Sequence, residues 1–218
     1  MEWIDLTYTI DEGCMTCGTP WHVRPYVKRL GTIKDVGRNT SVIQLGSHTA
    51  THLDSPLHFF DGTYSVDEIP LQKLCGEIQV VDLSFKEAGS VVTMEDLQGI
   101  TPSPKMLFRF LWYKNWGSDC FYKGFPHFSM EVLEWLVKNG LEMLALDTPS
   151  PDSGTAISEK NDSPGHKLLL KNQVVIVEYL TQTQALDPTK RYEIVALPLK
   201  LKGSDGSPAR VIVREMQS

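Results

Sequence analysis

Short runs of β-forming residues recur along the whole chain, and this repetition limits the folds available to it. Gly, Pro, Asp or Ser bounds each run, as expected for strands that end in turns. The eight runs are Trp3–Thr7, Thr40–Leu45, Ile78–Leu83, Met106–Leu111, Met143–Leu146, Val174–Tyr179, Glu193–Leu197 and Ala209–Arg214. Helical patterns are fewer and do not alternate regularly with these runs, which argues against a doubly wound parallel sheet. The sequence therefore predicts an α/β fold with a mixed, barrel-like β-sheet and flanking helices.

Two segments carry the signals of a helix start. Ser129 can cap a helix whose apolar residues share one face, and Asn139-Gly140 is a typical helix end. Thr93 and Asp96 have the spacing of a shorter start of the same kind. We expect these segments to be among the helices that flank the sheet.

Size and charge exclude several classes of protein. A chain of 218 residues, 41% apolar and 22% charged, is long enough to bury a core, and we expect a single domain spanning residues 1–218. The net charge is −6 and no stretch gathers enough Lys and Arg to follow a phosphate backbone, so we expect no nucleic-acid partner. No run approaches the roughly 18 apolar residues of a membrane helix, and the start lacks the pattern of a signal peptide. The sequence predicts a cytoplasmic protein without membrane partners.

The four cysteines fit a reducing compartment. Cys75 and Cys120 are isolated in the sequence, and only Cys14 and Cys17 form a short C-M-T-C pair. Such a pair can be half of a zinc site or a redox motif, but no second pair lies nearby, and Gly13, Gly18 and Pro20 place it in a loop. Unpaired thiols are the favoured interpretation.

Three of the six histidines lie within eleven residues. They are His48, His52 and His58, and together with Asp54 they have the spacing H-x3-H-x-D-x3-H. Imidazole and carboxylate are ligands that both zinc and manganese accept in proteins. Burying four such side chains together without a metal or other partners would cost several kcal/mol. The cluster therefore predicts a metal site.

The spacing also predicts a local distortion of the backbone. Four residues of extended strand cover about 13 Å, whereas metal–nitrogen bonds are about 2.0–2.1 Å long, so a flat strand cannot bring His48 and His52 to one ion. The chain must curl between them, and the small side chain of Ala50 permits this. Pro56 then prevents a helix from continuing.

Further ligands must come from elsewhere in the chain. His166 opens a short apolar segment, and Glu178 ends the apolar run Val174–Val177, where a carboxylate is costly unless it is paired or coordinated. The alternative for Glu178 is an exposed strand end. His22 and His127 are interpreted as ordinary surface or hydrogen-bonded core histidines.

The residues from 48 to 58 resemble the signature of a known family. They read His-Thr-Ala-Thr-His-Leu-Asp-Ser-Pro-Leu-His and are similar to the H-T-G-T-H-x-D-x-P-x-H pattern of the cyclase-like metal-dependent hydrolases, which include bacterial kynurenine formamidases and isatin hydrolases. Ala50 stands where the family usually has glycine. The resemblance extends over nearly the whole chain, including Gly165-His166, Glu178 and the segment Gly206–Arg210.

The resemblance implies a division of roles. The metal ligands it implies are His48, His52, Asp54, His166 and Glu178. His58 is implied to be the catalytic residue that carries protons, and an imidazole that titrates near neutrality suits that role. One or two divalent ions per subunit are implied, Zn²⁺ first and Mn²⁺ as the alternative. A bound ion of this kind can activate water, so the implied reaction is hydrolysis of a small linear or cyclic amide, such as an arylformamide.

Family members are usually homodimers or larger assemblies in which N-terminal aromatic residues shape the pocket, so a homodimer or homotetramer is implied. Trp21 is the candidate substrate-binding residue, with a core or turn aromatic as the equal alternative. The loops Gly13–Arg24 and Ser150–Pro164 are expected to set the shape of the pocket, and the sequence does not identify the substrate.

Two other functions remain open at this stage. One is a metal-dependent protein that binds a small ligand without turnover, which would not need a proton carrier such as His58 beside the ligands. The other is thiol redox chemistry at Cys14 and Cys17.

Overall fold

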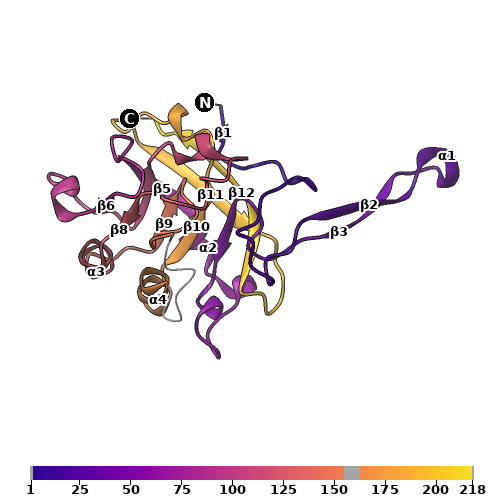
Figure 1. Ribbon diagram of the computed structural model, residues 1–218, viewed down its shortest axis with the longest axis horizontal. Coiled ribbons are helices and arrows are strands. Elements are labelled where there is room, and N and C mark those ends of the chain that lie inside the picture. Colours follow the sequence, from indigo (N-terminus) through magenta and orange to yellow (C-terminus); the bar gives the residue numbers. More distant parts are fainter. Residues whose placement is uncertain (1, 155–162, 218) are drawn as a thin grey trace.

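Seven strands form a closed sheet in the computed structural model, which describes residues 2–154 and 163–217 (Figure 1). Their order around the sheet is β12 (Gly206–Glu215), β11 (Tyr192–Pro198), β5 (Cys75–Asp82), β7 (Lys105–Arg109), β9 (Met143–Leu146), β10 (Val175–Glu178) and β4 (His52–Asp54). The sheet closes because β4 pairs with β10 on one side and with β12 on the other. β5, β7, β9 and β10 run parallel, and β1 (Ile4–Asp5) adds to the far part of β12. The predicted mixed, barrel-like α/β fold is confirmed.

Each of the eight predicted runs overlaps a strand, although most bounds shift by one to three residues. The sequence did not predict four of the strands, which are β2 (Tyr26–Gly31), β4, β6 (Val91–Val92) and β8 (His127–Phe128). β4, β6 and β8 have only two or three residues each, too few to show an alternating pattern.

Some of the helices pack against the outside of the closed sheet. The predicted α3 (Met130–Lys138) is confirmed, with the Ser129 side chain accepting a hydrogen bond from the Val132 amide. The Thr93 signal begins a 3-10 helix, Met94–Leu97, with a capping box. The short apolar segment that follows His166 lies in α4 (Pro164–Lys171), a helix that the sequence did not predict and that has proline at its start. The remaining helices of the described residues are α1 (Ile33–Val36), α2 (Leu71–Leu74) and the 3-10 helices Pro56–His58, Val66–Glu68, Trp112–Asn115 and Thr183–Ala185.

Alternating residues of the strands form two separate apolar clusters. Residues from all seven strands fill the interior, including Leu53 of β4 and Val177 of β10. The intervening residues, such as Ile176, pack outward against α3 and α4. Because side chains alternate along a strand, His52, Asp54 and Glu178 also leave the outer face, on the side where α4 lies. The candidate site is therefore built on the outside of the barrel.

A hairpin of β2 and β3 (Thr40–Gln44) projects from the body, with α1 at its tip (Figure 1). Its residues are exposed throughout except for Gly31 and the half-buried Thr32. We call residues 24–44 the arm. Large apolar side chains of the arm face solvent, among them Leu30, Ile33 and Ile43, which are 65%, 67% and 62% exposed.

Within residues 2–154 and 163–217, none of the helices has both the length and the apolar character of a membrane span. Residues 155–162, which belong to the predicted pocket loop Ser150–Pro164, lie outside the described residues.

Candidate metal centre

The predicted curl between His48 and His52 is centred on Ala50. Ala50 has a φ of 52°, in the left-handed region that glycine adopts more easily, and it is buried. Thr51 fixes the curl because its hydroxyl donates a hydrogen bond of 2.6 Å to the Tyr179 carbonyl. The turned Ala50 carbonyl accepts a hydrogen bond of 2.7 Å from Nδ1 of His52. This leaves Nε2 of His52 with a free lone pair directed at the site.

A 3-10 turn after β4 brings in the third histidine of the motif. Pro56 begins the turn, and the His58 amide donates to the Ser55 carbonyl. The ring of His58 then lies beside that of His48, with 4.1 Å between centroids. His58 is the most accessible histidine of the motif, with its side chain 25% exposed.

The distal residues come from β10 and α4. Glu178 faces His52 across the strand pair, with Oε2 3.4 Å from Nε2 of His52. His166 lies in the first turn of α4, with Nε2 3.2 Å from Oε1 of Glu178 and 3.6 Å from Oδ2 of Asp54. Glu178 is 4% exposed, so the alternative of an exposed strand end was wrong. The structure thus brings all five predicted metal ligands together.

The approach of α4 to the site depends on a glycine. A Cβ atom at Gly165 would lie 2.7 Å from Leu133 of α3 and 2.8 Å from Oδ1 of Asp152. Neither neighbour leaves room for a side chain at this position, so glycine allows the first turn of α4 to carry His166 into the site.

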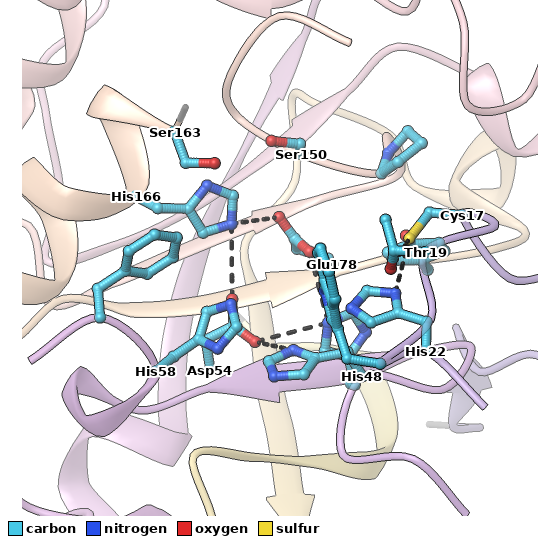
Figure 2. Close-up of a pocket in the computed structure, with 15 residues that line it drawn as sticks. Cys17, Thr19, His22, His48, Asp54, His58, Ser150, Ser163, His166 and Glu178 are labelled. Atoms are coloured by element: carbon cyan, nitrogen blue, oxygen red, sulfur yellow. Dashed lines mark hydrogen bonds and ion pairs between the residues drawn. The ribbon is translucent and has the colours of Figure 1, made fainter. Parts of the chain in front are cut away.

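Asp54 lies at the centre of the arrangement (Figure 2). Potential ligand atoms lie within 4.8 Å of one another in two groups, His48–Asp54–His58 and His52–Asp54–Glu178, which share Asp54. Its Oδ1 faces His48 at 2.8 Å, and its Oδ2 faces His166. A carboxylate with imidazoles on both sides can bridge two adjacent cations.

The buried carboxylates lack the hydrogen bonds that such groups require. Both oxygens of Asp54 and Oε1 of Glu178 are fully buried, yet none has a hydrogen-bond partner among the described residues. The 2.8 Å contact between His48 and Asp54 is an ion pair without hydrogen-bond geometry. Leaving such oxygens unpaired is costly, and a cation would satisfy them. The donor set therefore fits a divalent metal.

Burial dominates the ionisation of two groups. It lowers the pKa of His52 to about 3, so this imidazole is neutral and able to coordinate a metal at neutral pH. It raises the pKa of Glu178 to about 7, against the opposing effect of His166.

The other two imidazoles respond mainly to nearby carboxylates. Burial alone would lower the pKa of His48, but Asp54 and Asp205 outweigh it and raise that pKa to about 10. Glu178 and Asp152 likewise overcome burial and raise the pKa of His166. Protons on these rings supply the positive charge that the carboxylates need, and a divalent cation would replace them.

Sequence reasoning missed two carboxylates that touch the imidazoles. Oδ2 of Asp152 lies 2.6 Å from Nδ1 of His166. Oδ2 of Asp205 lies 2.7 Å from Nε2 of His48 and 2.9 Å from Nδ1 of His58. Metal-binding histidines almost always donate their other ring nitrogen to a carboxylate or carbonyl, so each predicted ligand implied such a partner. Nothing local in the sequence identified which aspartates these are.

A cavity of about 280 Å³ opens above the site. Trp21 lines it, lies in a turn and is 72% exposed, so it is not a core aromatic, whereas a turn aromatic and a substrate-binding residue both fit its position. His22 also lines the cavity, and its ring stacks on His48 with 5.8 Å between centroids. It is half-buried and hydrogen-bonded to Cys17, which is compatible with its interpretation as an ordinary histidine. Cys14 and Cys17 are free thiols, and Sγ of Cys17 lies 2.8 Å from Nδ1 of His22.

Comparisons with known proteins agree with this geometry. The sequence profile of the family described as "Putative cyclase" matches residues 4–153. A kynurenine formamidase from Bordetella petrii is 32% identical over 182 residues, covering 82% of this chain and 81% of that protein. One from Bacillus cereus is 27% identical over 218 residues, covering 98% and 97%.

A solved structure agrees as well. Isatin hydrolase A from Labrenzia aggregata superimposes with a TM-score of 0.84 and 26% identity, covering 97% of this chain and 93% of that chain. With these matches beside the His48–His58 motif, the chain belongs to the putative cyclase family, the cyclase-like metal-dependent hydrolases that its sequence resembles.

Proposed function

We propose that this protein is a metal-dependent amidohydrolase that cleaves the C–N bond of an arylformamide, as the names of its kynurenine formamidase relatives suggest. The unpaired buried oxygens of Asp54 and Glu178, surrounded by imidazoles, are the observation that carries the proposal. The isatin hydrolase match supports a cyclic amide as the second substrate class. A ligand-binding protein without turnover is not favoured, because its relatives carry the names of hydrolases.

The proposed metal ligands are His48, His52, Asp54, His166 and Glu178. Zn²⁺ is the proposed ion, with Mn²⁺ as the alternative, because both accept imidazole and carboxylate. Two ions that share Asp54 are proposed, since this residue belongs to both groups of potential ligand atoms. When bound, such ions polarise the substrate carbonyl and lower the pKa of water.

His58 is the proposed proton carrier. Its Nδ1 faces the Asp205 carboxylate, which only accepts hydrogen bonds, so Nδ1 carries a hydrogen and Nε2 holds the free lone pair. Nε2 takes a proton from the attacking water and returns it to the leaving nitrogen. Trp21 and Phe59 offer aromatic surfaces in the cavity wall for the aryl group.

Metal analysis followed by a substrate screen tests the function. Purified protein is expected to contain a divalent metal and, with Zn²⁺ or Mn²⁺ added, to hydrolyse an arylformamide faster than cyclic imides or lactams. A chelator should abolish this turnover, and returning the metal should restore it. Metal binding without hydrolysis of any amide would contradict the proposal and favour a binding protein.

Asp152→Asn is expected to weaken metal binding by about 10- to 100-fold, the usual effect of removing a carboxylate that orients a metal-binding histidine. The asparagine side chain can still accept a hydrogen bond, but it lacks the charge that holds His166. Competition with a chelator measures the affinity. Asp187→Asn, at a fully exposed aspartate, is the control, and equal affinities of the two variants would contradict the role of Asp152.

A homodimer formed through the arm is also proposed. The arm exposes Leu30, Ile33 and Ile43 to solvent, which is costly for an isolated chain. Residues 24–44 carry five basic residues and one acidic, a net charge of +4, whereas the whole chain carries −6. The acidic body of a second copy therefore complements the arm in charge.

Placing charges on the apolar side chains of the arm is expected to produce monomers. A variant with Leu30→Glu, Ile33→Glu and Ile43→Glu should sediment at the monomer mass at concentrations where the unmodified protein is dimeric, because each change buries a charge in the interface. Leu71→Glu is the matched control, since Leu71 is 66% exposed and lies outside the arm. A sedimentation mass of four chains in the unmodified protein would indicate a homotetramer instead.

A further inference from the structure

A single carboxylate oxygen holds two histidines of the site at once. Oδ2 of Asp205 lies 2.7 Å from Nε2 of His48 and 2.9 Å from Nδ1 of His58. In the proposed function, His48 holds metal and His58 carries protons, so Asp205 connects the two tasks. His52 and His166 instead have separate acceptors, the Ala50 carbonyl and Asp152.

The position of Asp205 is fixed by its backbone. Its carbonyl accepts hydrogen bonds from the amide of Ser55 at 2.9 Å and from the Ser55 hydroxyl at 3.0 Å. The next residue, Gly206, pairs with Asp54 where β12 meets β4. A Cβ atom at Gly206 would lie 2.9 Å from the His48 ring, so the glycine allows the histidine to approach this strand. Asp205 is thus held beside the ligand strand, although its side chain remains 37% exposed.

The chemistry of a carboxylate determines which ring nitrogens carry hydrogen. An ionised aspartate accepts hydrogen bonds and cannot donate them, and Oδ2 of Asp205 lies within hydrogen-bond distance of both rings. Both facing nitrogens therefore carry a hydrogen. When a metal replaces the second proton of His48, the free lone pair of this ring is on Nδ1, which faces Oδ1 of Asp54 at 2.8 Å. The free lone pair of His58 is on Nε2.

We infer that Asp205 is a positioning residue that sets the tautomers of His48 and His58 together. Through His48 it directs Nδ1 toward the metal position beside Asp54. Through His58 it leaves Nε2 free for the proton and places a negative charge next to the imidazolium that forms. The inference rests on the proposed function for its catalytic consequence, but the tautomers are properties of the protein without substrate.

The tautomers are measured directly by long-range ¹H–¹⁵N correlation spectra of zinc-loaded protein labelled with ¹⁵N-histidine. The unmodified protein is expected to show His58 only in the Nδ1–H form and His48 with hydrogen on Nε2. In Asp205→Asn, the His58 signals should shift to include the Nε2–H form, because the amide nitrogen can donate to Nδ1. An unchanged His58 tautomer in this variant would overturn the inference, whether or not the protein hydrolyses any amide.

Two control variants separate positioning from a general effect on the fold. Asp67 accepts a hydrogen bond from the amide of Gly203, which lies in the same loop as Asp205, but Asp67 contacts no imidazole. In Asp67→Asn, the tautomers of His48 and His58 should therefore stay as in the unmodified protein. Asp152→Asn should alter only His166. If Asp67→Asn changes the His58 signals as much as Asp205→Asn does, the role belongs to the loop and not to the carboxylate.

Kinetics provide the second measurement. Asp205→Asn is expected to lower kcat by about 10- to 100-fold with KM unchanged, while elemental analysis still finds the metal. In a His58→Ala background the same change should lower kcat by less than about threefold, because its main route of action has been removed. If Asp205→Asn still lowers kcat by about 10- to 100-fold in the His58→Ala background, Asp205 does not act through His58, and this part of the inference is overturned.

Discussion

His52→Ala is expected to lose most of its bound metal and, with it, nearly all activity. His52 is buried and neutral, its Nδ1 is engaged with the Ala50 carbonyl, and its Nε2 faces both Asp54 and Glu178. Removing the ring leaves the buried carboxylates of Asp54 and Glu178 without the neutral nitrogen ligand that lies between them. The loss of metal affinity should exceed the 10- to 100-fold typical of an orienting partner, so at least about 100-fold is expected. Elemental analysis and chelator competition measure it.

His22→Ala is the matched control for this experiment. His22 lines the same cavity and stacks on His48, but it is outside the proposed ligand set. It should retain the metal of the unmodified protein. Because His52→Ala also opens a buried space, circular dichroism must show that the variant remains folded. A folded His52→Ala protein with full metal content would remove His52 from the centre.

His58→Ala is expected to separate metal binding from catalysis. The variant should keep nearly full metal occupancy, because the five proposed ligands remain, while kcat falls by about 10²- to 10⁴-fold, the usual contribution of a positioned acid–base group. His58 is also the most accessible histidine of the motif, so its removal should disturb the fold little. Steady-state kinetics and metal analysis of the same preparation provide both values.

The two opposite results for His58→Ala have distinct meanings. Ligand atoms of His58, His48 and Asp54 lie within 4.8 Å of one another, so a metal ligand is the competing role. Loss of metal in the variant would assign that role to His58. Turnover at the unmodified rate with metal retained would show that proton transfer does not need this imidazole.

The local part of the site could be predicted from the sequence because its geometry is encoded within eleven residues. The spacing from His48 to His58 required a curl, and the curl is present at Ala50. Pro56 was expected only to prevent a helix from continuing, and in the structure a 3-10 turn begins at this residue. Strands such as β9 and β10 were predicted for a similar reason, because their apolar residues form uninterrupted runs.

The parts that escaped prediction depend on contacts between distant segments. β4 has three residues and exists because β10 and β12 pair with it on both sides. Asp152 and Asp205 are unremarkable in the sequence, and only the folded chain brings them to His166 and His48. β2 was missed because its exposed residues, including Lys28 and Arg29, show no alternation between buried and exposed sides.

The double pairing of β4 determines when the metal centre can be assembled during synthesis. Gly206–Pro208 of β12 complete the sheet beside β4, and Asp205, just before them, contacts His48. Residues 205–208 leave the ribosome long after His52 and Asp54. The His48–His58 motif therefore cannot adopt its final geometry when it is synthesised, but only once residues 205–208 have followed. Until then the nascent chain exposes a cluster of imidazoles and carboxylates without its final geometry. We therefore expect selective binding of the metal ion only after the whole chain has been synthesised and folded.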